Sequence, residues 1–146
     1  MIIWPGLTGL SELAHHKEPA LHMKITGQMW AWTVEYPEQG VKIPAAQEFV
    51  LPVGKTVQID VESKDVLHSF WVPAFRQKID AVPGKTTTVY ITPDQLGNKD
   101  SDISYRLQCA ELCGVGHSLM ANPVKVVEQR DFDSWLSSQK QRAEAR

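Results

Sequence analysis

The sequence predicts one all-β domain, a sandwich of two sheets, with a short helix at its C-terminal end. Many short segments alternate between apolar and polar residues, which is the period of a strand with one buried face. Turns rich in Pro and Gly separate these segments at short intervals. No helical pattern between them is long enough to be the crossover of a parallel sheet.

The strands can be assigned in chain order. Residues 21–25 place Leu, Met and Ile on one side, and residues 30–36 place two Trp, a Val and a Tyr on one face. The Pro and Gly of residues 37–40 predict a turn. We interpret Trp32 and Trp71 as core side chains because large aromatic residues are highly buried on average. Further strands are predicted at residues 57–62, 70–72, 86–91, 103–107 and 124–127.

The two ends of the chain differ from its middle. Residues 1–20 contain Pro and Gly breaks and the pair His15–His16, and we expect them to form a tether outside the core. The domain is expected to span residues 21–138. Residues 139–146 are expected to form a polar tail.

A helix is predicted just before this tail. The carboxylate of Asp131 can cap its N-terminus. Phe132, Trp135 and Leu136 are spaced so that they share one helical face, which we expect to pack on the sandwich. From Ser137 onward the sequence is polar, and we expect it to fray.

Composition excludes several functional classes. The chain has 146 residues and a formal net charge of -2, without runs of Lys or Arg, which argues against a nucleic-acid partner. No apolar stretch approaches the roughly 20 residues that a membrane helix needs. We therefore expect the chain as given to be soluble.

Potential metal ligands are concentrated in the string CAELCGVGHSLM at residues 109–120. Cys109, Cys113, His117 and Met120 follow one another at intervals of four, four and three residues. The two glycines among them favour a loop that folds the donors together over a continuous helix.

One further donor, His68, stands far upstream in the string DVLHSFWVP. A neighbouring loop at the same end of a sandwich could bring it to the cluster. Thiolates, imidazoles and a thioether are soft to borderline donors, and together they favour copper over magnesium or calcium.

The donors permit two copper arrangements. One Cys, two His and a weak axial Met would suffice for a mononuclear blue-copper site, which leaves the second Cys without a role. Two thiolates can instead bridge two copper ions, each with one terminal His. The weak axial donors are then the Met120 sulfur and a backbone carbonyl near Glu111, and every soft donor has a use.

The string C-x-E-L-C-G-x-x-H-x-x-M, with DVLHSFWVP upstream, closely resembles subunit II of cytochrome c oxidase. KIDAVPG at residues 78–84 and WAWTVEY at residues 30–36 match that family in order and spacing, and the matching part runs from about Gly27 to Val127. The resemblance implies a cupredoxin-like Greek-key β-sandwich with a dinuclear CuA centre. The copper ligands that it implies are His68, Cys109, Glu111 (through its carbonyl), Cys113, His117 and Met120.

The same resemblance implies roles for other residues. Trp30 is expected to be the surface aromatic through which electrons enter from cytochrome c, and Asp65 and Asp80 are expected to belong to the acidic docking patch. The Glu111 side chain is similar to a ligand of a magnesium ion at the border with subunit I. The implied function is single-electron transfer from cytochrome c to the haem of subunit I.

The resemblance also implies a location and a division of labour. The domain would lie in the periplasm, or more generally on the outer face of an energy-transducing membrane. It would contact the membrane only through an N-terminal hairpin that the family carries and this chain lacks. The enzyme would be the whole oxidase, and the domain would be an electron-transfer module without turnover of its own.

Three alternatives stay open from the sequence. A thioredoxin-like copper-delivery protein also uses C-x-x-x-C with a distant His, but it predicts alternating helices and strands. The CuA domain of nitrous oxide reductase needs a large His-rich partner domain. A structural zinc site or a disulfide leaves Met120 without a role.

Overall fold

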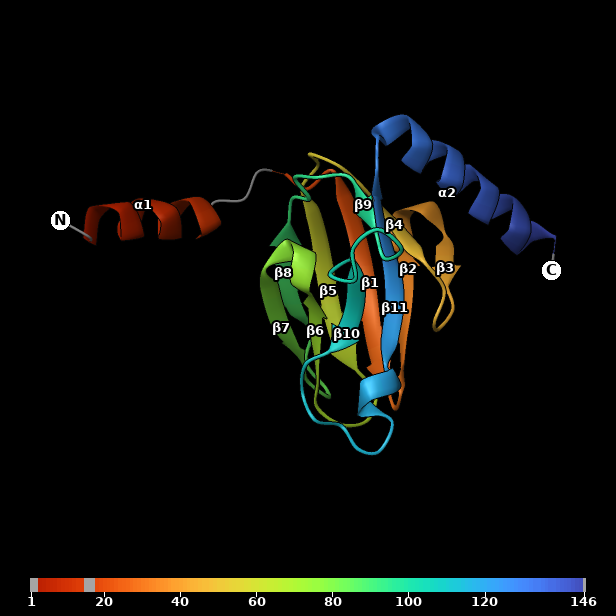
Figure 1. The fold of residues 1–146 in the computed structure, drawn as a ribbon, viewed down its shortest axis with the longest axis horizontal. Helices are drawn as coiled ribbons and strands as arrows, with labels where there is room; N and C mark the ends of the chain where they lie inside the picture. Colours follow the sequence, from red (N-terminus) through yellow and green to blue (C-terminus); the bar gives the residue numbers. More distant parts are fainter. Residues whose placement is uncertain (1–2, 15–17, 146) are drawn as a thin grey trace.

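The computed structural model describes residues 3–14 and 18–145, and its main body is a sandwich of two β-sheets (Figure 1). One sheet has the strand order β3-β2-β1-β5-β8. The other has the order β4-β11-β10-β6-β7, with β9 paired to β11. The strands are β1 (Leu21–Gln28), β2 (Ala31–Tyr36), β3 (Val41–Ile43), β4 (Phe49–Pro52), β5 (Val57–Ser63), β6 (His68–Val72), β7 (Gln77–Ala81), β8 (Thr87–Ile91), β9 (Gly97–Asn98), β10 (Arg106–Cys109) and β11 (Ala121–Val127).

The predicted all-β sandwich is confirmed, and most neighbouring strands run antiparallel. Two pairs are parallel: β1 with β5, and β4 with β11. Both parallel pairs join segments that are far apart in the sequence. Strands β3, β4, β7 and β9 were not among the predicted strands, because they are short or lack a clear apolar alternation.

The core lies between the two sheets and is formed by the inward side chains of both. Trp32, Tyr36, Phe49 and Phe70 are its largest fully buried members. The Tyr36 hydroxyl donates to the Val50 carbonyl at 2.7 Å, so a buried polar group is satisfied between the two sheets. Burial raises the pKa of this hydroxyl far above its ordinary value.

Two tryptophans lie outside the core: Trp30, which was expected at the surface, and Trp71, which was expected in the core. Trp30 does not share the buried face of Trp32, because β2 begins only at Ala31 and the Trp30 side chain is 39% exposed. Trp71 is half-buried on the outer face of β6, since the buried positions of that strand are its alternate neighbours Phe70 and Val72. Both residues belong to the surroundings of the site described below.

Helix α2 (Gln129–Glu144) begins before the predicted cap and continues through most of the predicted tail. The polar residues beyond position 138 are mostly good helix formers, and this propensity extends the helix past the predicted domain boundary. Its inward face is as predicted: Phe132 is buried, and Trp135 and Leu136 pack against the core. The rings of Phe132 and Trp135 contact Tyr36, with centroids 6.2 and 5.5 Å away.

Helix α1 (Ile3–Ala14) occupies most of the segment predicted as a tether. In Figure 1 it lies apart from the sandwich, and its apolar side chains, Trp4 among them, are exposed. The His15–His16 pair lies outside the described residues. No helix in the described part of the chain is long and apolar enough to span a membrane.

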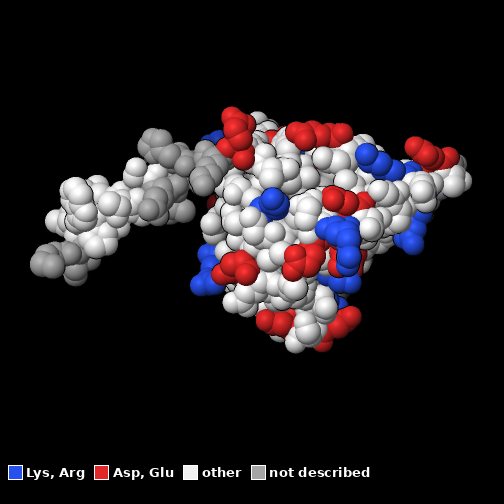
Figure 2. Space-filling view, turned by 90° about the horizontal axis from the view of Figure 1, so that it is seen from above, with Lys and Arg blue, Asp and Glu red and all other residues white. Residues whose placement is uncertain are grey.

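The two ends of the sandwich differ in character. Figure 2 looks onto the end that is uppermost in Figure 1, where acidic and basic side chains are interspersed without a large area of one sign. At the opposite end, the β1–β2 turn, the β5–β6 loop and the β10–β11 loop lie together (Figure 1). These three loops carry most of the predicted site residues.

Candidate metal centre

Three segments bring the potential ligands together. His68 is the first residue of β6, and Cys109 is the last residue of β10, so stiff strands of one sheet position both. Cys109 pairs with Phe70 in the register of β10 and β6, which places it beside the start of the His68 strand. The loop 110–120 supplies the remaining donors before β11 begins.

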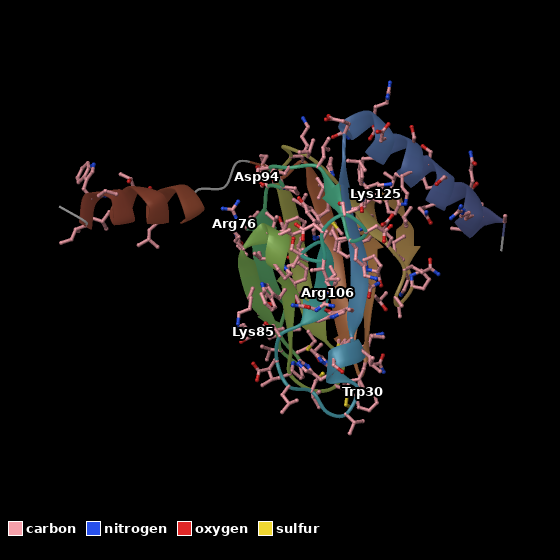
Figure 3. All side chains as sticks on the ribbon, viewed as in Figure 1. Trp30, Arg76, Lys85, Asp94, Arg106 and Lys125 are labelled. Atoms are coloured by element: carbon pink, nitrogen blue, oxygen red, sulfur yellow. The ribbon has the colours of Figure 1, made fainter. Side chains whose placement is uncertain are left out.

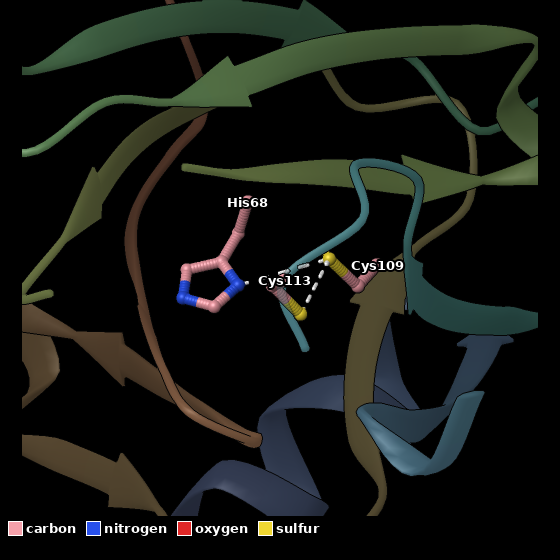
Figure 4. A group of neighbouring side chains, drawn as sticks. All are labelled: His68, Cys109 and Cys113. Carbon is pink, nitrogen blue, oxygen red and sulfur yellow. Dashed lines mark hydrogen bonds between the residues drawn. The ribbon is translucent and has the colours of Figure 1, made fainter. Parts of the chain in front are cut away.

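The two cysteine sulfurs lie at the centre of the cluster. Their Sγ atoms are 3.7 Å apart, well beyond the roughly 2.0 Å of a disulfide, so both thiols are free. The Nδ1 atom of His68 lies 3.8 Å from the Cys109 Sγ (Figure 4). The donor atoms of His68, Cys109 and Cys113 all lie within 4.8 Å of one another, and all three residues are buried.

The other predicted donors surround this pair of sulfurs. His117 Nδ1 lies 3.6 Å from the Cys113 Sγ, and Met120 Sδ lies 4.0 Å from the same sulfur. The carbonyl oxygen of Glu111 lies 3.1 Å from the Cys109 Sγ. All six predicted ligand groups are therefore gathered around two adjacent sulfurs. This set of soft donors fits copper, and a structural zinc site would leave the Met120 sulfur without a role.

The imidazole of His68 is held rigidly. Its side chain is fully buried, and its Nε2 lies 2.8 Å from the Asp65 Oδ1. The Asp65 carboxylate accepts the Nε2–H, and Nδ1 faces the Cys109 sulfur. The Trp32 ring contacts the imidazole edge-on, with the two ring centroids 5.9 Å apart. Gly27 completes the packing, because a Cβ there would lie 2.9 Å from Trp32 and 3.0 Å from His68.

Asp65 also ties two of the loops together. Its Oδ2 accepts the backbone N–H of Met29 at 2.7 Å, and its Oδ1 accepts that of Val66 at 2.7 Å. Partial burial alone would raise the pKa of the Asp65 carboxyl. The hydrogen bonds from Met29, His68 and Val66 outweigh it and hold that pKa below its ordinary value. The carboxylate is thus kept ionised beside His68.

The thiol of Cys113 is protonated at neutral pH in the metal-free protein. Burial, followed by the neighbouring Cys109, raises its pKa to about 11. A metal that binds this sulfur must displace its proton, so binding releases protons and strengthens as pH rises.

Trp30 lies against the ligand loop. Its indole N–H donates to the carbonyl of Cys113 at 3.0 Å. A Cβ on Gly116 would come within 2.4 Å of the Trp30 ring, so the ring packs directly on the loop backbone. Gly114 has φ of +112°, a conformation that favours glycine. Trp30, the entry residue predicted from the sequence, is therefore partly exposed and is hydrogen-bonded to the backbone of Cys113.

A cavity of about 590 Å³ is lined in part by His117 and Cys109. Its wall comes mostly from the outer face of β6, β7 and β10. Lys78, Arg106 and Gln108 had no predicted role, although the strand alternation around Leu107 already predicts that its neighbours Arg106 and Gln108 face outward. The lining residues are Trp71, Lys78, Arg106, Gln108, Cys109, Ala110, His117 and Ser118.

The two predicted docking acids lie in different places. Asp65 is in the β5–β6 loop, and its carboxylate is largely used by the internal hydrogen bonds described above. Asp80 is exposed on β7, opposite Ser69 of β6. Neither position tests the docking role, which stays a prediction.

Comparison with known families agrees with the resemblance. The family described as "Cytochrome C oxidase subunit II, periplasmic domain" matches residues 39–128. A curated cytochrome c oxidase subunit 2 from Thermostichus vulcanus is 39% identical over 127 residues, covering 87% of this chain and 36% of that protein. The heme-copper oxidase subunit 2 of Aeropyrum pernix is 38% identical, covering 79% of this chain and 47% of that protein. The chain thus spans about a third to a half of the length of these relatives.

Solved structures give the same result. The periplasmic domain of cytochrome oxidase subunit II from Bradyrhizobium japonicum has a TM-score of 0.77 and 31% identity, covering 86% of this chain and 97% of that one. A subunit II domain captured in a mixed disulfide with a thioredoxin-like protein has a TM-score of 0.73 and 30% identity, covering 88% of this chain and 96% of that one.

The fold also removes one alternative, since a thioredoxin-like copper-delivery protein would alternate helices with strands along the chain. The donor cluster, the β-sandwich and the similar proteins indicate the same family. The chain belongs to the cytochrome c oxidase subunit II family and corresponds to its periplasmic domain.

Proposed function

We propose that this domain relays single electrons from cytochrome c, through a dinuclear copper centre of the CuA type, to the haem of subunit I of a terminal oxidase. The observation that carries the proposal is the pair of free thiols 3.7 Å apart, with an imidazole Nδ1 near each sulfur. Bound copper supplies a one-electron couple there. The ligands that we propose are His68, Cys109, the Glu111 carbonyl, Cys113, His117 and Met120.

The rigidity of the donors supports an electron-transfer role over a role in metal delivery. His68 and Cys109 belong to strands, and both side chains are buried. A centre that exchanges electrons works best when its ligands change position little between oxidation states, and a preformed site provides this. A delivery protein must release its metal, which a buried imidazole bonded to a carboxylate would hinder.

Electron entry is proposed at Trp30. Its indole is partly exposed and donates to the Cys113 carbonyl, so a hydrogen bond links the protein surface to a ligand residue. Apolar side chains are also exposed in the same three loops at the end of the sandwich that carries Trp30: Met29, Val66, Leu67, Leu112, Val115 and Leu119. We call this set the apolar rim. An exposed apolar patch of this kind is typical of a protein-binding surface, and we propose that cytochrome c docks on it.

Acidic groups add to this docking proposal. Asp65 and Asp80 are proposed to attract a basic face of cytochrome c. In the intact complex, the exposed side chain of Glu111 is proposed to help bind a magnesium ion at the border with subunit I. Both roles need partner proteins, and the copper centre does not depend on them.

The central test is the copper content of reduced protein after loading, together with its EPR spectrum. We expect two copper ions per chain and a hyperfine pattern that requires two equivalent nuclei. Cys113→Ser should reduce the stoichiometry to one or give mixed species, because only one bridging sulfur remains. One copper per wild-type chain, or an unchanged spectrum in Cys113→Ser, would refute the dinuclear centre.

The entry route is tested by stopped-flow reduction of the copper-loaded domain by reduced cytochrome c. Trp30→Ala should leave the copper spectrum intact and slow the reduction. Trp4→Ala is the matched control, because Trp4 is also exposed but lies on α1. Equal rates for the wild type and Trp30→Ala would show that electrons enter elsewhere.

A further inference from the structure

The methionines of the chain differ sharply in exposure. Met23 is fully buried in the core, and the proposed ligand Met120 is 1% exposed. Met29 is 45% exposed, and no other methionine within the described residues is open to solvent. A thioether reacts with a dissolved oxidant only where the oxidant can reach the sulfur. Oxidation of the folded domain is therefore expected at Met29, whereas burial protects Met120.

Met29 is held beside the proposed electron-entry residue. It lies in the turn between β1 and β2 and directly precedes Trp30. Its backbone N–H donates to the Asp65 Oδ2 at 2.7 Å, and the Oδ1 of the same carboxylate accepts the N–H of Val66. One carboxylate thus fixes two members of the apolar rim, which come from two different loops. A chemical change at Met29 therefore takes place within the proposed docking surface.

Oxidation of Met29 changes the polarity of the apolar rim without changing its charge. A thioether is apolar, flexible and polarizable, and methionine is common at surfaces that bind other proteins. The sulfoxide is neutral but polar, and its oxygen accepts hydrogen bonds from water. A partner that covers this oxygen must remove that water, and the apolar side chains of the rim offer no donor in exchange. Docking on the rim should therefore weaken.

We propose that Met29 is an oxidation-sensitive modification site, at which a peroxide slows electron entry through Trp30. Hydrogen peroxide transfers one oxygen atom to the sulfur, which is oxidised by two electrons to the sulfoxide, and the rest of the peroxide leaves as water. Methionine sulfoxide reductases reverse the change. This inference rests on the proposed electron-transfer function and adds a means of regulating its entry surface.

The first experiment locates the oxidation. Limiting hydrogen peroxide is added to the folded, copper-free domain, and peptide mass spectrometry measures the gain of one oxygen at each methionine. We expect Met29 to react about tenfold faster, or more, than Met23 and Met120. In concentrated urea, where burial is lost, the three rates should converge. Equal rates in the folded protein, or a faster reaction at Met120, would overturn the assignment.

The second experiment measures the consequence for electron entry. The copper-loaded domain is treated with peroxide, and stopped-flow kinetics then follow its reduction by cytochrome c. The rate constant should fall about tenfold while the copper spectrum stays unchanged, and it should recover after incubation with methionine sulfoxide reductases. Each variant is compared with its own untreated sample. Met29→Leu should lose no rate on treatment, because leucine has no sulfur to oxidise.

A matched control moves the exposed methionine away from the apolar rim. Leu96 is 55% exposed, which is close to the exposure of Met29. Figure 3 shows Asp94, two residues before Leu96, at the opposite end of the sandwich from Trp30. The double variant Met29→Leu/Leu96→Met should gain an oxygen at position 96 as readily as the wild type does at position 29. Its rate of reduction should not fall on treatment.

The outcomes separate this inference from the proposed function. An untreated domain that binds no copper, or takes no electrons from cytochrome c, would refute the proposed function, and the mass measurement would still decide the assignment of the modification site. Selective oxidation of Met29 without a loss of rate, or an equal loss in the control double variant, would overturn its role at the entry surface.

Discussion

The two imidazoles beside the sulfur pair are held in different ways. His68 is fully buried, bonded to the Asp65 carboxylate and enclosed by Trp32 and Gly27. His117 is half-buried, comes from a short loop helix and lines an open cavity. Their Nδ1 atoms nevertheless lie at similar distances from a sulfur, 3.8 and 3.6 Å. A similar distance between imidazole and sulfur is therefore reached by burial at His68 and by a loop at His117.

The two ways of holding an imidazole have different consequences. A ligand enclosed by the core gives the centre a fixed frame, because core side chains sit in close-packed surroundings. A ligand at a cavity wall can lie close to a partner that docks there.

The largest effect is expected when either histidine is replaced by glycine and the copper-loaded protein is supplied with free imidazole. His117→Gly should regain the copper spectrum, since imidazole can enter through the adjoining cavity. His68→Gly should not, because that ring lies fully buried behind Trp32. His22→Gly, which alters a histidine on β1 paired with Asp60, is the control and should bind copper normally. Equal rescue of both ligand variants would remove the contrast.

A smaller loss of copper binding is expected when Asp65, the hydrogen-bond partner of His68, loses its charge. Asp65→Asn should lower copper affinity by about 10–100-fold. A neutral amide accepts the His68 Nε2–H more weakly than a carboxylate does, so the imidazole is oriented less firmly and its Nδ1 binds copper less strongly. Competition with a chelator measures this affinity. Asp60→Asn is a close control, since Asp60 contacts His22 at the same 2.8 Å but lies on the outer face of β5. An Asp65→Asn protein with wild-type affinity would contradict the role given to this hydrogen bond.

Rigidity around His68 can be tested without changing a ligand. Gly27→Ala places a Cβ 2.9 Å from Trp32 and 3.0 Å from His68, both of which are fully buried. We expect the free energy of unfolding of the copper-free protein to fall by about 1–3 kcal/mol in urea titrations. Gly6→Ala on α1 has no atom within 4 Å of the added Cβ and should change stability little. A fully stable Gly27→Ala protein would show that the packing there can adjust.

The smallest change in the copper site is expected when the thioether of Met120 is replaced. Met120 is almost completely buried, and its sulfur lies 4.0 Å from the Cys113 Sγ. Met120→Leu conserves volume and should cost less than about 1.5 kcal/mol in stability. The dinuclear spectrum should persist, and the reduction potential should rise, because loss of a weak donor favours Cu(I). A lowered potential in redox titration would contradict an axial role.

The site was more predictable than the fold around it. The intervals between Cys109, Cys113, His117 and Met120 already define a loop of soft donors, because few other functions use these residues together. Strand alternation located β1, β5 and β8 closely. It misplaced Trp71, since an aromatic side chain on the outer face of a strand has the same apolar signal as a core residue.

Helix bounds were predictable only in part. The apolar face of α2 follows from the spacing of Phe132, Trp135 and Leu136, and these residues do pack on the core. The end of that helix does not follow from apolar spacing, because the polar residues beyond position 138 stay helical through their own propensity. The helical conformation of α1 was likewise not predicted from the sequence.

By itself, the sequence determined which atoms could bind a metal and which class of metal they prefer, because donor chemistry belongs to each side chain. Only the tertiary structure decided how those donors are supported. Asp65 and Trp32 meet His68 through contacts between loops and sheets, and Lys78 and Arg106 reach one cavity through the register of three strands. Such juxtapositions depend on how distant segments pair, and no local pattern along the chain encodes that pairing.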